Sequence, residues 1–158
     1  GRGRGIAVHE SFGSWAAHVA EVTVGINGNF TIDRVVAAID CGLAVHPDGI
    51  RMQMESGIVY GLTSTLKGEI TIKKGAVEQS NFHEFELLQI DETPEMEIHI
   101  VDSSEPPGGA GEPGLPPVAP AVANAIFDAT GARIREAPFT PERVKQALAS
   151  RTTQSSRK

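Results

Sequence analysis

Glu112 is the residue whose surroundings most suggest chemistry. It stands between Gly111 and Pro113 in a fifteen-residue stretch, SSEPPGGAGEPGLPP, that is mostly Gly, Pro and Ser. Such a stretch forms neither helix nor strand, so it is a defined loop or a linker. A lone carboxylate held rigidly in a partly dry pocket is how proteins build a general base. The alternative is a solvated loop acid, because single glutamates are mostly exposed.

The same loop contains a glycine spacing that formally matches the dinucleotide-binding pattern G-x-G-x-x-G, at Gly109, Gly111 and Gly114. We interpret this match as accidental. A Ser-Ser-Glu-Pro-Pro segment separates the glycines from the preceding strand sequence, whereas a true fingerprint follows its strand directly. Pro116 and Pro117 also lack the N–H donors that a pyrophosphate needs at the start of a helix.

The histidines and the cysteine do not predict a metal site. The five histidines show no paired ligand spacing such as H-E-x-x-H, and Cys41 is the only cysteine, which excludes a disulfide or a cysteine-ligated cluster within the chain. His18 is predicted to be a core or sheet residue with its polar atoms satisfied, and His99 to lie on a strand surface. No metal ligand is therefore assigned, and the compartment stays undecided.

Composition predicts one globular domain of a larger protein. The 158 residues are 40% hydrophobic and 22% charged, and the net charge of −6 disfavours nucleic acid or an anionic membrane as the main partner. The longest uncharged run, residues 113–127, contains four prolines and is shorter than the roughly 20 residues of a membrane span. Gly1 leads almost directly into strand-like sequence, so we expect a piece of a longer chain. The polar residues 150–158 are predicted to be a disordered tail.

The first of the elements expected to position this loop is an extended segment. Residues 6–24 alternate between two largely apolar faces, which predicts a central strand. Asn27-Gly28 is a strong hairpin signal, and residues 30–40 form the returning strand.

A helix is predicted over residues 47–66. Pro47 and Asp48 suit its first turn, Gly68 suits its end, and an apolar residue recurs at every fourth position from Ile50 to Leu66. A second stripe at the same spacing is formed by Gln53, Gly57 and Gly61. Because a glycine in a helix costs about 1 kcal/mol relative to alanine, we expect something to approach this stripe closely. Another helix or strand packing there is the simpler explanation.

The rest of the chain mixes short strands and helices. Residues 69–79 predict a short edge hairpin, residues 81–93 are irregular, and residues 96–100 alternate as a strand. A helix is predicted over 118–130, closed by Gly131, and a final helix of about nine residues begins after the cap Thr140. The predicted class is α+β, a mixed or antiparallel sheet with two main helices and a short C-terminal helix. A single helix follows the Gly/Pro stretch, so the stretch is interpreted as a loop within the domain.

The order of these features resembles the molybdenum hydroxylase family, in particular the molybdopterin-binding large subunit of the isoquinoline 1-oxidoreductase type within the xanthine dehydrogenase and aldehyde oxidase superfamily. The segments that carry the resemblance are GIAVHESFGSWAAHVAEVTV, IDCGLAVHPD, RMQMESGIVYGL, SNFHEF and EPPGGAGEPGLPPVAPAVANAIFDATG. Met52 stands where the xanthine dehydrogenase branch usually has Gly, which favours the isoquinoline branch. By this resemblance, residues 1–149 are the C-terminal part of a molybdopterin-binding domain.

The resemblance implies a role for each matching residue. Glu112 matches the glutamate that acts as base on the metal-bound hydroxyl. Gln53 matches a glutamine that contacts the pyranopterin, and Gly57 matches a small residue beside it. Gly109, Ala110 and Gly111 match the loop whose backbone approaches the molybdenum centre.

The implied activity is hydroxylation of N-heterocycles or oxidation of aldehydes by a molybdenum-cofactor oxidoreductase, the cofactor being a molybdopterin in a dinucleotide form. Implied partners are the remainder of the large subunit, a separate [2Fe–2S] small subunit and the small-molecule substrate. The fragment alone is expected to bind no cofactor and to be inactive. The second hypothesis, from a different class, is a non-catalytic interaction module that needs no cofactor.

Overall fold

The computed structural model describes residues 1–155, with side chains described as far as Ser150. Its main sheet has four strands, β1 (Arg2–Ser11), β2 (Ser14–Val24), β3 (Phe30–Asp40) and β6 (Glu95–Ile100). They lie in the order β1-β2-β3-β6, with β1 to β3 antiparallel and β6 parallel to β3. The predicted class, α+β with a mixed sheet, is therefore confirmed.

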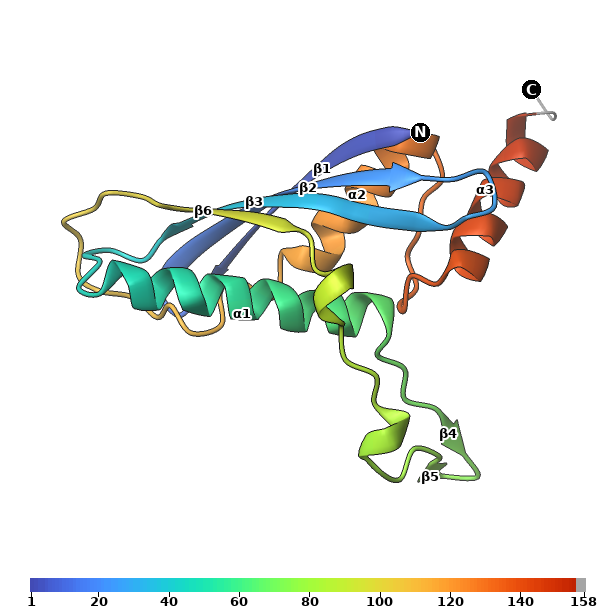
Figure 1. Ribbon diagram of the computed structural model, residues 1–158, viewed down its shortest axis with the longest axis horizontal. Helices are drawn as coiled ribbons and strands as arrows, with labels where there is room; N and C mark the ends of the chain where they lie inside the picture. The colour runs from blue at the N-terminus through green and yellow to red at the C-terminus, as the bar shows by residue number, and fades with distance from the viewer. Residues whose placement is uncertain (156–158) are drawn as a thin grey trace.

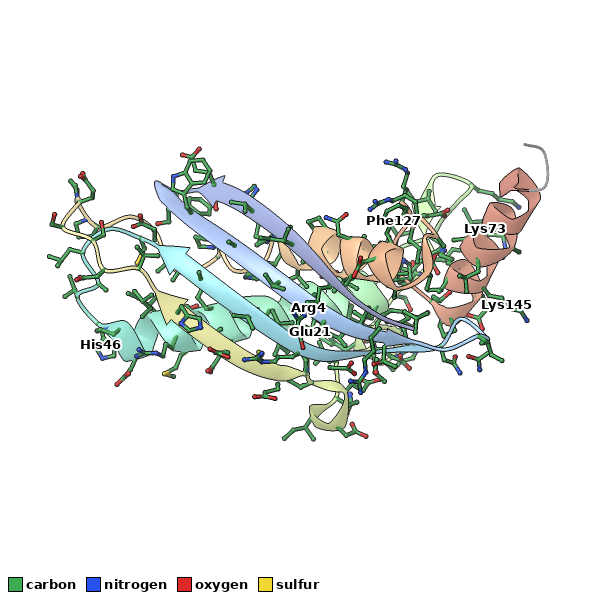
Figure 2. All side chains as sticks on the ribbon, turned by 90° about the horizontal axis from the view of Figure 1, so that it is seen from above. Arg4, Glu21, His46, Lys73, Phe127 and Lys145 are labelled. Carbon is green, nitrogen blue, oxygen red and sulfur yellow. The ribbon has the colours of Figure 1, made fainter. Side chains whose placement is uncertain are left out.

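Two helices cover one face of this sheet, as Figure 1 shows. α2 (Val118–Thr130) packs on β1 and β2, while α1 (Pro47–Leu66) runs along β6 and contacts α2. Seen from above in Figure 2, the strands lie in front of both helices, and neither helix covers the opposite face. The core accordingly lies between the sheet and the helices, around Ile39, Met54, Ile58, Leu62 and Ile126.

The single extended stretch predicted for residues 6–24 is wrong at one point, because it contains a turn. Ser11 pairs with Ser14, and the two residues between them, Phe12 and Gly13, have φ angles of 56° and 72°. A two-residue turn with both φ values positive matches the twist of antiparallel strands. Phenylalanine rarely adopts this conformation, so the sequence carries no recognisable turn signal there. β2 is nevertheless central, as predicted.

The other local predictions for the long elements are confirmed. The turn between β2 and β3 contains Gly28 with a φ of 88°, and α1 begins and ends at the predicted residues. The backbone N–H groups of Lys67 and Gly68 both bond the carbonyl of Thr63 at the end of α1. α2 ends at Gly131, whose φ of 71° is the left-handed conformation typical of a helix C-terminus.

The covered face of β1 is built for close backbone contact with α2. A Cβ atom on Gly5 would lie 2.2 Å from the Ala121 carbonyl oxygen and 2.2 Å from the Ala125 nitrogen. A Cβ on Gly3 would lie 2.3 Å from the Ala125 carbonyl oxygen. Only glycine leaves room for the helix at these two positions.

The peripheral elements complete the chain. β4 (Ile72–Lys73) and β5 (Ala76–Val77) form the predicted short hairpin, which projects away from the main sheet (Figure 1). Short 3₁₀ turns at Phe82–Glu84 and Ile90–Glu92 interrupt the irregular segment. No helix within residues 1–155 is both long enough and apolar enough to cross a membrane.

The last helix, α3 (Pro141–Ser155), is longer than the nine residues predicted. Its start is as expected, since the Thr140 hydroxyl accepts a hydrogen bond of 3.3 Å from the Arg143 backbone N–H. The helix enters the range 150–158 that was predicted to be a disordered tail. The remainder of that range, residues 156–158, lies outside the described residues.

His18 is buried as predicted, but the prediction that its polar atoms are satisfied is wrong. The side chain is fully buried in the middle of β2, and both ring nitrogens lack a hydrogen-bond partner. Its neighbours on β1 and β3 are Ala7 and Ala37, which offer no polar side-chain atoms. Burial lowers the pKa of His18 to about 4, so the ring is neutral at physiological pH. His99, in contrast, is exposed on β6 and bonds Glu97 at 2.7 Å, as a strand-surface residue should.

Candidate functional site

Three of the six residues predicted for the site meet at one cavity of about 380 Å³. The cavity lies where β3 ends and α1 begins, and the Gly/Pro loop forms its other wall. Gln53 lines it from the second turn of α1, and Ala110 and Gly111 line it from the loop. His46 marks this end of the molecule in Figure 2, far from Lys145 at the other end.

The loop is fastened to the strands at its beginning. The Gly108 N–H bonds the Cys41 carbonyl at 2.8 Å, and the Gly109 N–H bonds the Phe12 carbonyl at 2.9 Å. A Cβ on Gly108 would lie 2.4 Å from the Ser14 hydroxyl, and one on Gly109 would lie 2.6 Å from the Phe12 Cβ. Both glycines are therefore required by the close contact between the loop and the β1–β2 turn. Gly109 does not line the cavity.

The other end of the loop packs against the glycine stripe of α1. A Cβ on Gly57 would lie 3.1 Å from the Gly114 carbonyl carbon, and one on Gly61 would lie 2.7 Å from the Val118 Cγ2. The close approach predicted for this stripe is confirmed, and the approaching segment belongs to the same chain. Gly57 is buried under the loop, outside the cavity, so its contact with a cofactor stays a prediction.

Gly111 and Glu112 lie between these two fastened ends. A Cβ on Gly111 would meet nothing within 4 Å, so packing within the described chain gives no reason for a glycine there. Glu112 is exposed, and no side chain among residues 1–150 bonds its carboxylate. The backbone of Glu112 is anchored by one hydrogen bond, 3.0 Å from the Leu115 N–H to its carbonyl, while the rigid placement of its side chain stays a prediction. The predicted partly dry pocket is absent from the described chain.

The cavity is also lined by two residues with ionisable side chains, His46 and Cys41, that the sequence did not assign to the site. The Nδ1 atom of His46 accepts a 2.7 Å hydrogen bond from the Gly49 backbone N–H and so caps α1. Its place just before Pro47 was the available signal, because proline favours the first helical position. The Cys41 thiol is buried, and both burial and the neighbouring Asp40 charge raise its pKa, which keeps the thiol protonated.

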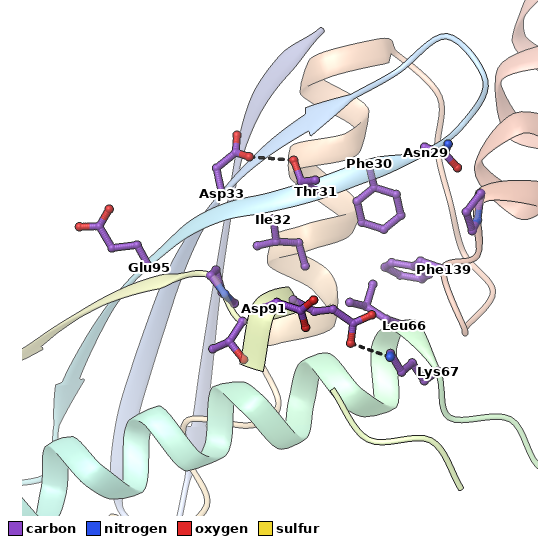
Figure 3. A pocket seen from close by; sticks show the side chains of 14 residues that line it. Asn29, Phe30, Thr31, Ile32, Asp33, Leu66, Lys67, Asp91, Glu95 and Phe139 are labelled. Carbon is purple, nitrogen blue, oxygen red and sulfur yellow. Dashed lines mark hydrogen bonds and ion pairs between the residues drawn. The ribbon is translucent and has the colours of Figure 1, made fainter. Parts of the chain in front are cut away.

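A larger cavity of about 500 Å³ lies elsewhere, near the C-terminal end of α1 (Figure 3). Its walls are apolar at Phe30, Ile32 and Phe139, and Lys67 at its edge pairs with Glu92 at 2.6 Å. None of the predicted site residues lines it. We therefore place the candidate site at the smaller cavity, where residues from separate elements converge.

The sequence matches a family model at the same elements. Residues 5–94, which hold most of β1, all of β2, β3 and α1, and end before the Gly/Pro loop, match the model of the molybdopterin cofactor-binding domain. The chain belongs to this family. The resemblance to this family that the sequence indicated is thereby confirmed.

Individual relatives agree with this family assignment. The chain is 38% identical over 157 residues to one of the subunits of nicotinate dehydrogenase from Pseudomonas putida, a match that covers 93% of this chain and 13% of that protein. It is 32% identical over 142 residues to the beta subunit of isoquinoline 1-oxidoreductase from Brevundimonas diminuta, covering 89% of this chain and 18% of the relative. The chain thus spans less than a fifth of the length of these curated relatives.

A solved structure shares the fold. The aldehyde oxidoreductase from Desulfovibrio gigas superposes with a TM-score of 0.74 at 26% identity, covering 86% of this chain and 15% of that chain. The mixed sheet with its helices is therefore the architecture of a molybdopterin-binding domain.

The residues at the cavity fit a molybdopterin cofactor. Gln53 offers an amide donor and acceptor, and the open side of Gly111 leaves room for a planar ring system beside the loop backbone. Among the described residues, no group of three or more His, Cys, Asp or Glu side chains could hold a metal ion. A cofactor that carries its metal on its own sulfur atoms needs no such group.

Proposed function

We propose that this chain forms one wall of the molybdopterin site in the large subunit of an oxidoreductase that hydroxylates N-heterocycles or oxidises aldehydes. The cofactor is proposed to be a dinucleotide form of molybdopterin. A separate [2Fe–2S] subunit is proposed as the electron acceptor. Most of such a large subunit lies outside this chain, so the isolated chain is proposed to be inactive.

The observation that supports this proposal is the convergence of Gln53 and the loop on one cavity. Gln53 and Gly111 lie 58 positions apart in the sequence and line the same space. Gly108, Gly109 and Gly114 each have a packing neighbour within the chain, whereas Gly111 has none. A glycine with no internal neighbour is what a loop needs if a bound molecule passes close to its backbone.

Each residue of the wall then has a task. Gln53 binds the pterin through its amide, and the backbone from Gly109 to Gly111 approaches the metal end of the cofactor. Glu112 accepts the proton from the oxygen that attacks the substrate carbon. The bound cofactor supplies the two-electron oxidation of that carbon. The backbone hydrogen bonds of the loop fix the main chain that carries Glu112, which limits the positions that its carboxylate can reach and so favours proton transfer.

Replacing Glu112 tests the proposal in the full-length subunit purified with its iron–sulfur partner. Glu112→Gln should lower turnover of heterocycles or aldehydes at least about 100-fold, because a general base contributes roughly 10²–10⁴ in rate. Molybdenum content should not change. Glu105→Gln is the matched control, an exposed glutamate in the same loop, and should keep normal turnover. Near-normal turnover of Glu112→Gln would contradict the role of base.

Metal analysis of the same preparation separates this proposal from the second hypothesis. A wild-type subunit that contains molybdenum supports the enzyme. A wild-type subunit that is folded, assembled and free of molybdenum would favour the non-catalytic interaction module.

A further inference from the structure

The face of the sheet opposite the helices carries a continuous apolar patch. Its members, here called the open-face patch, are Ile6, Val8, Trp15, Val19 and Val36. Ile6, Val8 and Trp15 expose 61%, 58% and 55% of their surface. The strand register places Ile6 beside Val19 and Val19 beside Val36, so the row crosses three strands without a polar interruption.

The patch covers only part of the open face. Toward the opposite end of the strands the face is polar and charged, where Arg4 pairs with Glu21 at 2.9 Å and Arg34 pairs with Glu97. At the near end of the patch, Trp15 lies between Glu10 on β1 and Asp40 on β3. The exposed face of an antiparallel sheet is usually polar throughout. An apolar half bounded by ion pairs is therefore typical of a surface that a second layer covers, with the charges at its rim.

The patch also adjoins the candidate site. Trp15 lies next to the β1–β2 turn, whose residue Phe12 is 64% exposed and whose carbonyl holds the Gly109 N–H. A layer on the patch would reach the turn that fastens the loop carrying Glu112.

We propose that the open-face patch is the docking face for the rest of the same large subunit, which contributes an apolar layer over β1, β2 and β3. This inference rests on the proposed function, because it takes the chain to be part of that subunit. The relatives leave more than four-fifths of their length outside the region matched by this chain. α1 and α2 already cover the other face of the sheet. The open face is therefore the one that the remainder of the subunit can cover.

One substitution compared in two contexts tests the docking face. Val8→Lys changes an exposed side chain, so in the 158-residue chain it should leave the melting temperature within about 3 °C of wild type. In the full-length subunit the lysine would be buried in an apolar interface, and soluble yield should fall at least about tenfold. Thr31→Lys, an exposed residue on the polar half of the same face, should change neither quantity.

Oxidative footprinting of Trp15, read by mass spectrometry of its peptide, gives a second measurement that does not depend on activity or metal. Trp15 is the only tryptophan in the chain, and its modification rate should be at least about tenfold lower in the full-length subunit than in the chain alone. The modification rate of Trp15 does not depend on whether the subunit contains molybdenum. Failure of the docking face and failure of the proposed function are therefore distinguishable.

Three results would overturn the proposal. Equal Trp15 reactivity in the two contexts would mean that nothing covers the patch. An equal loss of stability from Val8→Lys in both contexts would assign Val8 to the internal packing of this chain. A dimer of the chain alone that Val8→Lys disperses, with a normal full-length subunit, would make a second copy the occupant.

Discussion

The two faces of the β1–β3 sheet both carry apolar residues, yet these residues differ in size. The helix-covered face uses Gly3, Gly5 and small residues such as Ala16 and Ala20, which bring the backbone of α2 into contact with the strands. The open face carries Ile6 and other large side chains. Small residues require a partner backbone that is already in place, whereas large apolar residues require a layer with side chains of its own. Residue size therefore distinguishes a face that is covered by other parts of this chain from a face that is covered by residues outside it.

The largest effect is expected from adding one carbon to the covered face. Gly5→Ala places a Cβ 2.2 Å from backbone atoms of α2, so the helix must move. We expect the free energy of unfolding to fall by about 3 kcal/mol or more. Urea denaturation of the chain followed by circular dichroism measures it.

Ile6→Ala is the matched control on the adjacent residue of the open face. It removes an exposed side chain and should cost less than about 1 kcal/mol. Similar losses from Gly5→Ala and Ile6→Ala would mean that the two faces do not differ in how completely the chain packs them.

An intermediate effect is expected from His18, the one histidine buried on the covered face within the described residues. Its pKa is about 4 in the folded chain and 6.5 without burial. Between these values the unfolded chain binds more protons, so stability is full above pH 6.5 and falls as the pH drops toward 4, by roughly 3 kcal/mol in all. His18→Leu should remove this pH dependence.

Chemical denaturation at pH 7.5, 5.5 and 4.5 measures the effect. His83→Gln, which alters an exposed histidine, should leave the pH dependence as in wild type. A slope that survives in His18→Leu would assign the pH dependence to other groups.

The smallest effect is expected at the polar end of the open face. Arg4 is 75% exposed in its ion pair with Glu21, so solvent screens the pair. Arg4→Ala should lower the free energy of unfolding by less than about 0.5 kcal/mol, and the difference should shrink further in 0.5 M NaCl. Thermal melts at low and high salt test this, and a loss above about 1 kcal/mol would mean that the pair is more than a rim contact.

Much of the fold could be predicted because its signals are local. The bounds of α1 follow from Pro47, Asp48 and a four-residue apolar repeat, and the β2–β3 hairpin follows from Asn27-Gly28. The turn at Phe12 was missed because its residue type contradicts its conformation. The parallel pairing of β6 with β3 joins residues about 60 positions apart in the sequence. A local sequence pattern does not identify a partner strand at that distance.

The candidate site was predictable only in part. Glycine is unfavourable within a helix, so Gly57 and Gly61 indicated that another segment packs on them. Which segment does so depends on where the loop folds back. The glycines of the loop look alike in the sequence, and only the structure separates Gly111, which faces open space, from Gly109, which does not. The exposure of Glu112 could not be foreseen, because burial depends on neighbours that the chain alone does not provide.

The contact between β1 and α2 also has a consequence during synthesis on the ribosome. Gly5 leaves the ribosome 120 residues ahead of Ala125, the helix residue that it must contact. At about 5–20 residues per second, α2 follows β1 after roughly 10 s. For that interval β1 and β2 lack the helix that packs on them. The order of translation thus leaves the glycine-lined surface of β1 uncovered until residues 118–130 have been made.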